Sequence, residues 1–284
     1  MKQVLVIVGP TASGKSALGI KLARYFQTEI INGDSVQVYK HYNIGSAKVT
    51  EDEKKGIIHH LIDIVEPSNH YDVKNFQEDA RDTIHNVSFP IIVGGTGFYI
   101  KAALYDYDFS AEERRLEETP LDNEALFKYI QSIDPSYQGD SQNRRRLLRA
   151  YELTKQGHLP SSKIGKNNAL YDVFTIYLDI EREQLKKRLR QRLDKQLEAG
   201  FIEEVKEIMA FTKVKDVIGY REIADYLQGL YDYDTMKEMI IKKSMIFAKK
   251  QKTWFKNQMN THVFDATSER LLEDVIEVIK TWKK

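Results

Sequence analysis

The chain has 284 residues, 42% of them hydrophobic and 30% charged, with a formal net charge of +1. No apolar stretch approaches the roughly 20 residues that a membrane span needs, so we expect no membrane partner. The sequence contains no cysteine, which excludes disulfides, thiolate zinc sites and cysteine nucleophiles and predicts a cytoplasmic location.

Apolar runs and helical periodicity alternate along the chain. Strands are expected over residues 3–9, 89–95, 173–180 and 261–266, and a further strand within residues 28–39 is expected to end near Asp34. Helices are expected over residues 16–26, 73–87, 97–105 and 181–200, the last ending at Gly200, and at the C-terminus. This alternation predicts an α/β fold with a parallel sheet flanked by helices.

One stretch interrupts the alternation. Between residues 109 and 168 the pattern contains helical segments, 124–133 and 143–157, and no convincing strand. We therefore predict a core domain made of residues 1–108 and 169–284, and a helical, partly basic insertion domain made of residues 109–168.

The segment GPTASGKS follows the first strand and matches the phosphate-loop pattern G-x-x-x-x-G-K-[ST]. Its glycines let backbone N–H groups surround an anion, and the following helix adds the positive end of its dipole. The predicted phosphate-binding residues are Gly9, Pro10, Thr11, Ala12, Ser13, Gly14, Lys15 and Ser16. The Lys15 ammonium would contact the phosphates, and the Ser16 hydroxyl would ligate Mg²⁺.

Two further strand ends supply polar groups beside this loop. Asp34 follows the second strand and could hold Mg²⁺ or accept a proton, and Thr96 lies in the GGTG that follows the third. The third strand ends without the acidic residue that a switch NTPase uses, and no N-K-x-D motif occurs. The residues alone leave open a small-molecule kinase with a basic lid, or an RNA-binding protein that uses a nucleotide as a switch.

Positive charge is concentrated in two tracts. Residues 141–166 contain seven Lys or Arg against one acid, and residues 237–256 again contain seven against one. Such tracts attract a polyanion locally, although solvated helix faces would produce the same pattern.

Seven segments occur in the order of a known family: GPTASGKS, INGDSVQVYKHYNIGSAK, HHLIDI, IIVGGTGFYI, NRRRLLRAYE, IGYRE and AKKQKTWF. Together they resemble the signatures of the tRNA dimethylallyltransferase, or tRNA isopentenyltransferase, family. The resemblance implies a P-loop kinase-like core with a helical insertion, and Mg²⁺ as cofactor. It also implies transfer of a dimethylallyl group from dimethylallyl diphosphate to the N6 amine of adenosine 37, next to the anticodon of tRNA. The zinc extension of eukaryotic relatives is absent, which indicates a bacterial form.

The resemblance also assigns roles to residues. Asp34, Thr96 and Lys15 would be catalytic, with Asp34 accepting the proton of the amine, and Arg221 would join the phosphate loop in binding diphosphate or contact RNA. The tRNA anticodon stem-loop would contact Asp34, Ser35, Val36, Gln37, Thr96, Gln142, Asn143, Arg144, Arg145, Arg146, Ile218, Gly219, Tyr220 and Arg221. The arginines of residues 144–149 cannot all face one way, so we expect one or two to contact RNA and the others to bridge within the protein. We expect a monomer.

Overall fold

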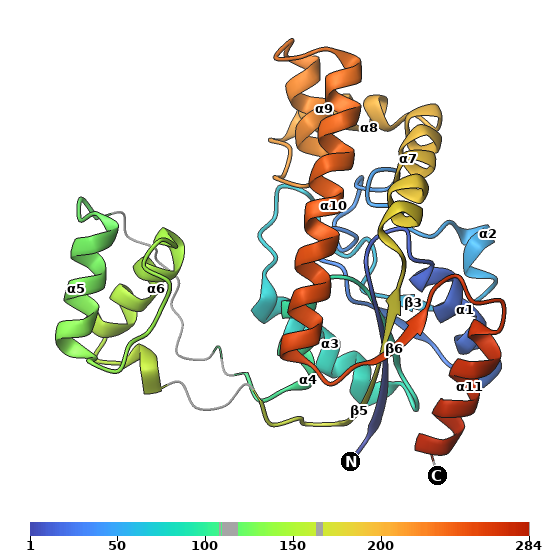
Figure 1. Ribbon diagram of the computed structural model, residues 1–284, viewed down its shortest axis with the longest axis horizontal. Helices are drawn as coiled ribbons and strands as arrows, with labels where there is room; N and C mark the ends of the chain where they lie inside the picture. Colours follow the sequence, from blue (N-terminus) through green and yellow to red (C-terminus); the bar gives the residue numbers. More distant parts are fainter. Residues whose placement is uncertain (108, 110–118, 163–166, 284) are drawn as a thin grey trace. The chain divides into compact units, whose positions relative to one another are not determined.

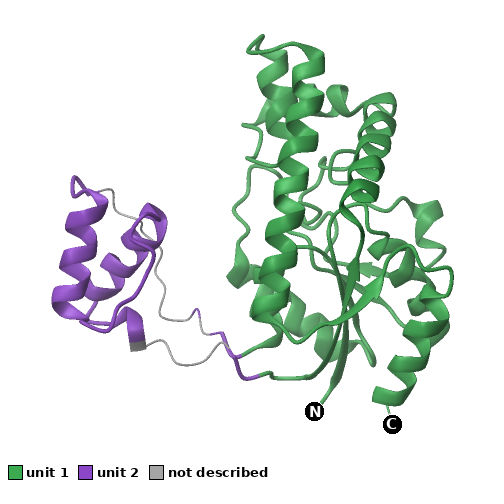
Figure 2. Ribbon diagram, in the orientation of Figure 1, with its two compact units in different colours: residues 1–105, 169–284 green, residues 106–168 purple. Residues whose placement is uncertain are grey.

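The computed structural model describes residues 1–107, 109, 119–162 and 167–283. The chain divides into two compact units, Met1–Tyr105 with Ala169–Lys284, and Asp106–Asn168 (Figure 2). The predicted insertion domain, residues 109–168, falls within the second unit.

The first unit is built on a six-stranded sheet with the order β3-β2-β4-β1-β5-β6 (Figure 1). The strands are β1 (Gln3–Val8), β2 (Ile30–Asn32), β3 (His59–His60), β4 (Ile91–Val93), β5 (Asp172–Asp179) and β6 (His262–Asp265). Each pairing between neighbouring strands is parallel, which confirms the predicted α/β fold. The short edge strand β3 was not predicted.

The central strand β1 is buried on both faces because its apolar side chains alternate between two layers. Leu5 and Ile7 pack against α1 (Lys15–Phe26) and α11 (Leu271–Trp282). Val4, Val6 and Val8 pack against α3 (Val73–Asn86), α4 (Gly97–Leu104) and the C-terminal end of α10 (Tyr233–Gln258). The sheet therefore lies between two helical layers, with the central strand in a dry core.

A third apolar cluster lies beyond the end of the sheet. The helices α7 (Arg182–Glu198), α8 (Phe201–Phe211), α9 (Tyr220–Leu227) and α10 pack there against the segment 36–44, which precedes the short helix α2 (Glu51–Lys54). Gly200, at φ 95°, separates α7 from α8, as the sequence predicted. Figure 1 shows α7, α8 and α9 at one end of the unit, with α10 running from that end down past the sheet. Among the described residues, no helix has the length and apolar character of a membrane span.

The second unit is a small helical body. It contains α5 (Asn123–Ile133), α6 (Arg144–Lys155) and a 3-10 turn, η1 (Pro160–Ser162), around the buried side chains Leu126, Ile130, Tyr137, Leu147 and Ala150. The Asp134 carboxylate accepts hydrogen bonds from the backbone N–H (2.7 Å) and hydroxyl (2.6 Å) of Ser161, which ties the turn to the end of α5. At the base of the unit, the Asp106 N–H donates to the Asn168 carbonyl at 3.1 Å.

Candidate active site

The predicted catalytic segments meet because they follow neighbouring parallel strands. The phosphate loop follows β1, Asp34 follows β2, and the GGTG segment follows β4, which lies between β1 and β2. The carboxyl ends of parallel strands share one edge of the sheet, where α/β proteins bind their ligands.

The backbone of the phosphate loop requires glycine. Gly9 and Gly14 have φ angles of 150° and 92°, and a Cβ atom on Gly9 would lie 2.7 Å from the Leu178 carbonyl oxygen of β5. The Ser13 hydroxyl is buried and has no hydrogen-bond partner among the described residues. A buried hydroxyl without a hydrogen-bond partner costs free energy unless a ligand satisfies it. The Ser13 hydroxyl is therefore suited to donate a hydrogen bond to a phosphate oxygen.

Two cations lie at the loop. The Lys15 ammonium donates to the Pro10 carbonyl at 2.7 Å, and the Arg192 guanidinium of α7 donates to the Thr11 hydroxyl at 2.7 Å. Burial, assisted by Arg192 and opposed by Asp34, lowers the pKa of Lys15 to about 8. Burial also lowers the pKa of Arg192, again opposed by Asp34. These three charged side chains therefore act on one another at the edge of the loop.

Sequence reasoning missed Arg192. It lies in a helix, α7, in which Lys and Arg recur at nearly every turn, and such a pattern normally indicates a solvated face. No local motif distinguishes Arg192 from its neighbours; only the packing of α7 beside the loop does.

The Asp34 carboxylate is fixed by its own turn. Its Oδ1 accepts hydrogen bonds from the backbone N–H groups of Val36 (2.8 Å) and Gln37 (3.4 Å), while Oδ2 has no hydrogen bond to a described residue. The Thr96 Oγ1 accepts a hydrogen bond from the Ser35 N–H at 3.0 Å and lies 3.2 Å from the Ser35 hydroxyl, to which it can donate. The structure thus brings Asp34, Ser35 and Thr96 together beside the phosphate loop.

Other residues predicted to contact tRNA lie in the same unit and bind neighbouring parts of the protein. The Gln37 amide donates to the carbonyl oxygens of Ser46 (3.0 Å) and Ala47 (3.3 Å). Val36 and Ile218 are partly buried in the cluster around α7–α10. Gly219 precedes α9 and donates its N–H to the Glu222 carboxylate at 2.6 Å.

Tyr220 and Arg221 differ sharply in exposure. Tyr220 is 0% exposed, so its side chain has no surface to offer RNA in this conformation. Burial, followed by the Glu204 carboxylate, raises the pKa of Tyr220. Arg221 is exposed and pairs with Asp225 on the same helix at 3.0 Å. Among the described residues, no hydrogen bond or ion pair joins Arg221 to the phosphate loop.

The arginines of the second unit divide into two kinds. The Arg144 guanidinium donates to the carbonyl oxygens of Thr119 (2.9 Å) and Leu121 (2.7 Å), so it holds the chain that precedes α5. Arg145 and Arg146 are exposed. Asn143 caps α6 by accepting from the Arg146 N–H, and the carbonyl oxygen of the exposed Gln142 accepts from Asn123. Lys163 and Lys166 of the same basic tract lie outside the described residues.

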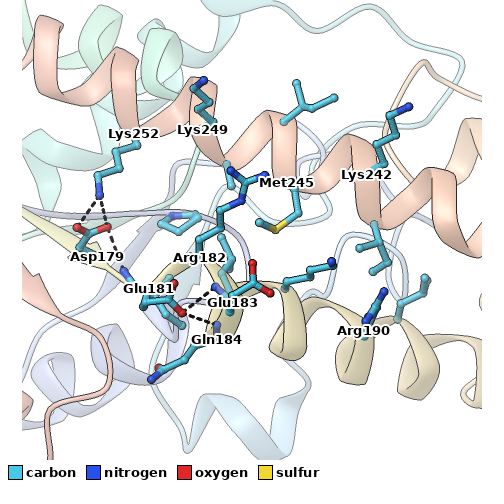
Figure 3. Close-up of a pocket in the computed structure, with 18 of the residues that line it drawn as sticks. Asp179, Glu181, Arg182, Glu183, Gln184, Arg190, Lys242, Met245, Lys249 and Lys252 are labelled. Carbon is cyan, nitrogen blue, oxygen red and sulfur yellow. Dashed lines mark hydrogen bonds and ion pairs between the residues drawn. The ribbon is translucent and has the colours of Figure 1, made fainter.

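A large cavity extends from the phosphate loop between α7 and α10 (Figure 3). Its volume is about 1740 Å³, and Pro10 and Tyr177 are among its lining residues.

The Lys252 ammonium contacts both oxygens of Asp179, at 2.8 and 2.7 Å, at the end of β5. A lysine therefore neutralises this strand-end carboxylate, which leaves it poorly suited to hold Mg²⁺.

A phosphate loop on the central strand of a parallel sheet, with a carboxylate and a hydroxyl on adjacent strand ends, defines a P-loop protein that acts on a phosphorylated ligand. Comparison with known proteins narrows this class. The IPP transferase family model matches residues 37–258, and the isopentenyl transferase model matches residues 2–64. The chain therefore belongs to the IPP transferase family, as its sequence signatures predicted, and is an enzyme of the tRNA dimethylallyltransferase type.

Individual relatives agree along nearly the whole chain. A tRNA dimethylallyltransferase of Acholeplasma laidlawii is 49% identical over 280 residues, which cover 99% of this chain and 98% of the relative. The crystal structure of a tRNA isopentenylpyrophosphate transferase from Bacillus halodurans matches with a TM-score of 0.77 at 31% identity, covering 99% and 97% of the two chains. A eukaryotic dimethylallyltransferase acting on tRNA matches with a TM-score of 0.86 at 28% identity, covering 99% of this chain and 79% of that one.

Proposed function

We propose that the protein transfers the dimethylallyl group of dimethylallyl diphosphate to the N6 amine of adenosine 37 in tRNA and releases diphosphate. The observation that carries this proposal is the meeting of three charged side chains at one edge of the sheet: Lys15 and Arg192 bind the phosphate loop, and Asp34 follows the nearby strand β2. The two cations suit a diphosphate, and the carboxylate suits a nucleophile that must lose a proton.

The donor reacts by cleavage of a C–O bond. As this bond breaks, positive charge develops on the allylic carbon and negative charge on the departing diphosphate. The N–H groups of the loop, Lys15 and Arg192 stabilise the negative charge in place, with the Ser13 hydroxyl as a further donor. This reaction does not require an activated water molecule. The transfer therefore does not need a free carboxylate at Asp179, which is bound by Lys252.

The acceptor amine becomes cationic when its nitrogen bonds to the allylic carbon, and a proton must then leave. Asp34 accepts this proton through Oδ2, while the amides that bind Oδ1 keep the carboxylate in place. Thr96 and Ser35, joined to each other, hold the adjacent backbone and orient the amine. Gln37 retains its amide oxygen for the adenine edge, because only its NH₂ group donates to the backbone.

We propose Mg²⁺ as cofactor, and the residues present fit it. Ser16 is exposed in the first turn of α1, and Mg²⁺ in phosphate sites takes one or two protein oxygens together with phosphate oxygens and water. Such a site needs no cluster of acids, and none of three or more His, Cys, Asp or Glu exists among the described residues. When bound, the ion neutralises part of the diphosphate charge.

The proposed macromolecular partner is the anticodon stem-loop of tRNA, met in the cytoplasm by a monomeric enzyme. The exposed Arg145 and Arg146 of α6 suit phosphate groups of the RNA backbone. The target base must leave the stack of its loop to reach Asp34.

Mass analysis of nucleosides from tRNA incubated with the enzyme, dimethylallyl diphosphate and Mg²⁺ tests the proposal. We expect one adenosine per tRNA to gain a C₅H₈ unit, and none when donor or enzyme is omitted. A Lys15→Ala variant should give no product because the donor no longer binds. Unmodified tRNA accompanied by tRNA-independent ATP turnover would instead identify a small-molecule kinase.

A further inference from the structure

The segment 43–47, here called the bracket loop, is held by three helices. The Glu204 carboxylate of α8 accepts hydrogen bonds from the backbone N–H groups of Asn43 (3.0 Å), Ile44 (2.7 Å) and Gly45 (3.1 Å). Three consecutive amides thus point at one buried carboxylate, which is 8% exposed. The Gln196 amide of α7 donates to the carbonyl oxygens of Ile44 and Gly45 on the same loop.

Tyr220 of α9 completes this arrangement. Its hydroxyl donates to Glu204 Oε1 at 2.7 Å and accepts from the Ser46 N–H at 3.1 Å. Its ring also packs against Tyr42 and Phe201, at centroid distances of 4.5 and 4.9 Å. The Glu204 carboxylate therefore accepts hydrogen bonds from four donors, three backbone N–H groups and one hydroxyl, which satisfy this buried polar group.

The bracket loop is connected to the Asp34 turn through Gln37. The Gln37 side chain donates to the carbonyl oxygens of Ser46 and Ala47, at 3.0 and 3.3 Å. The Gln37 backbone N–H, at the other end of the same residue, donates to Asp34 Oδ1 at 3.4 Å. Movement of the bracket loop would therefore displace the residue that helps to fix the Asp34 carboxylate.

We infer that Glu204 is a positioning residue for the transfer step, acting through the bracket loop and Gln37 on the Asp34 carboxylate. This inference rests on the proposed function. Glu204 does not touch the donor, since its partners all belong to the bracket loop and α9. Glu204 positions the residues proposed to bind the acceptor amine, whereas Arg192 contacts Thr11 of the loop proposed to bind the diphosphate of the donor.

The chemistry of the carboxylate makes the inference testable by a small change. A carboxylate presents only acceptor oxygens, whereas the amide of Gln presents one oxygen and an NH₂ group. Glu204→Gln would aim that NH₂ group at amide N–H groups or at the Tyr220 hydroxyl, so at least one donor loses its partner. Glu203→Gln is the matched control, because Glu203 is the adjacent, exposed residue of α8.

The decisive measurement is the single-turnover rate of dimethylallyl transfer to tRNA, per active site counted by the stoichiometry of diphosphate binding in calorimetry. We expect Glu204→Gln to lower this rate about 10- to 100-fold, because a displacement of about 1 Å in a reacting group costs up to a hundredfold. The Kd for diphosphate should stay within about twofold of wild type, because the phosphate loop is untouched. Glu203→Gln should match wild type in both.

Each outcome decides a different question. A Glu204→Gln rate equal to that of Glu203→Gln, with a lowered melting temperature alone, would show that Glu204 serves stability only. An equally large loss of diphosphate affinity would show a general disturbance of the site. Absence of transfer by wild-type enzyme would instead refute the proposed function itself.

A second variant keeps the test valid if Glu204→Gln fails to fold. Tyr220→Phe retains the ring packing and removes only the hydroxyl that joins Glu204 to Ser46. We expect a rate loss in the same direction, about 3- to 30-fold, with diphosphate binding unchanged. A wild-type rate in Tyr220→Phe overturns the positioning role in two cases: if Glu204→Gln is folded and fully active, or if Glu204→Gln does not fold.

Discussion

Raising the pH from 7 to 9 should weaken diphosphate binding, because the Lys15 ammonium loses its charge in this interval. Burial, assisted by the neighbouring Arg192 and opposed by Asp34, lowers the pKa of Lys15 from 10.5 to about 8. The charged form binds the anion, so the site is competent below this pKa and loses affinity above it.

The size of the effect follows from the titration. With a pKa of about 8, about nine-tenths of Lys15 is charged at pH 7 and about one-tenth at pH 9. If only the charged form binds diphosphate, the affinity falls about tenfold, or about 1.4 kcal/mol. A lysine with an ordinary pKa would remain almost fully charged over this interval, so its affinity would not change for this reason.

Calorimetry with inorganic diphosphate, without tRNA, measures the affinity over this pH range. Lys15→Arg is the control, because a guanidinium stays charged and the titration of diphosphate itself is common to both proteins. Nitrogen NMR of the lysine Nζ groups checks the cause, since the signal that Lys15→Arg removes should titrate near pH 8. A midpoint above about 10, or parallel affinity curves for both proteins, would refute the reasoning.

Further predictions concern catalysis, RNA binding and packing. Asp34→Asn should lower the single-turnover rate about a hundredfold to ten-thousandfold with little change in tRNA affinity; partial rescue by raised Mg²⁺ would instead mark Asp34 as a metal ligand. Replacing Arg145 and Arg146 by Ala should lower the slope of log affinity against log salt by about 1 to 2, and an unchanged slope would exclude phosphate contacts. Gly94→Ala places a Cβ 2.2 Å from the carbonyl group after β2 and should cost about 3 kcal/mol or more in urea unfolding. Gly14→Ala, with no atom within 4 Å, should cost about 1 to 2 kcal/mol through its φ of +92°, and an equal loss in both variants would contradict the clash.

The sequence predicted those parts of the fold that depend on short, local patterns of residues. The run at β1 is apolar on both faces, and the glycines of the phosphate loop meet positive φ angles. The strand β3 escaped prediction because His59 and His60 carry no strand pattern. They pair with β2 through their backbones, and His60 is held by Glu29 at 2.5 Å.

The meeting of the candidate site residues at one sheet edge could be predicted for the same reason. Lys15, Asp34 and Thr96 each follow a strand, so topology alone places them together. Arg192 and Glu204 lie on helices distant in sequence, and their contacts with Thr11 and the bracket loop depend on packing that no spacing encodes. The likeness of the IGYRE segment to a family signature drew Tyr220 into the RNA contacts, although its side chain is fully buried.

The chain leaves and re-enters the core at one point, so the length of the intervening segment can change without altering the core. Tyr105 and Ala169 form an antiparallel bridge, and the Leu170 N–H donates to the Leu104 carbonyl at 2.9 Å, so the core joins its own backbone where the intervening segment departs and returns. A short turn in place of residues 106–168 would reduce the entropy cost of loop closure by about 2 kcal/mol, because that cost grows only with the logarithm of length. Lengthening the segment is equally inexpensive, so this junction tolerates insertions and deletions that leave the sheet untouched.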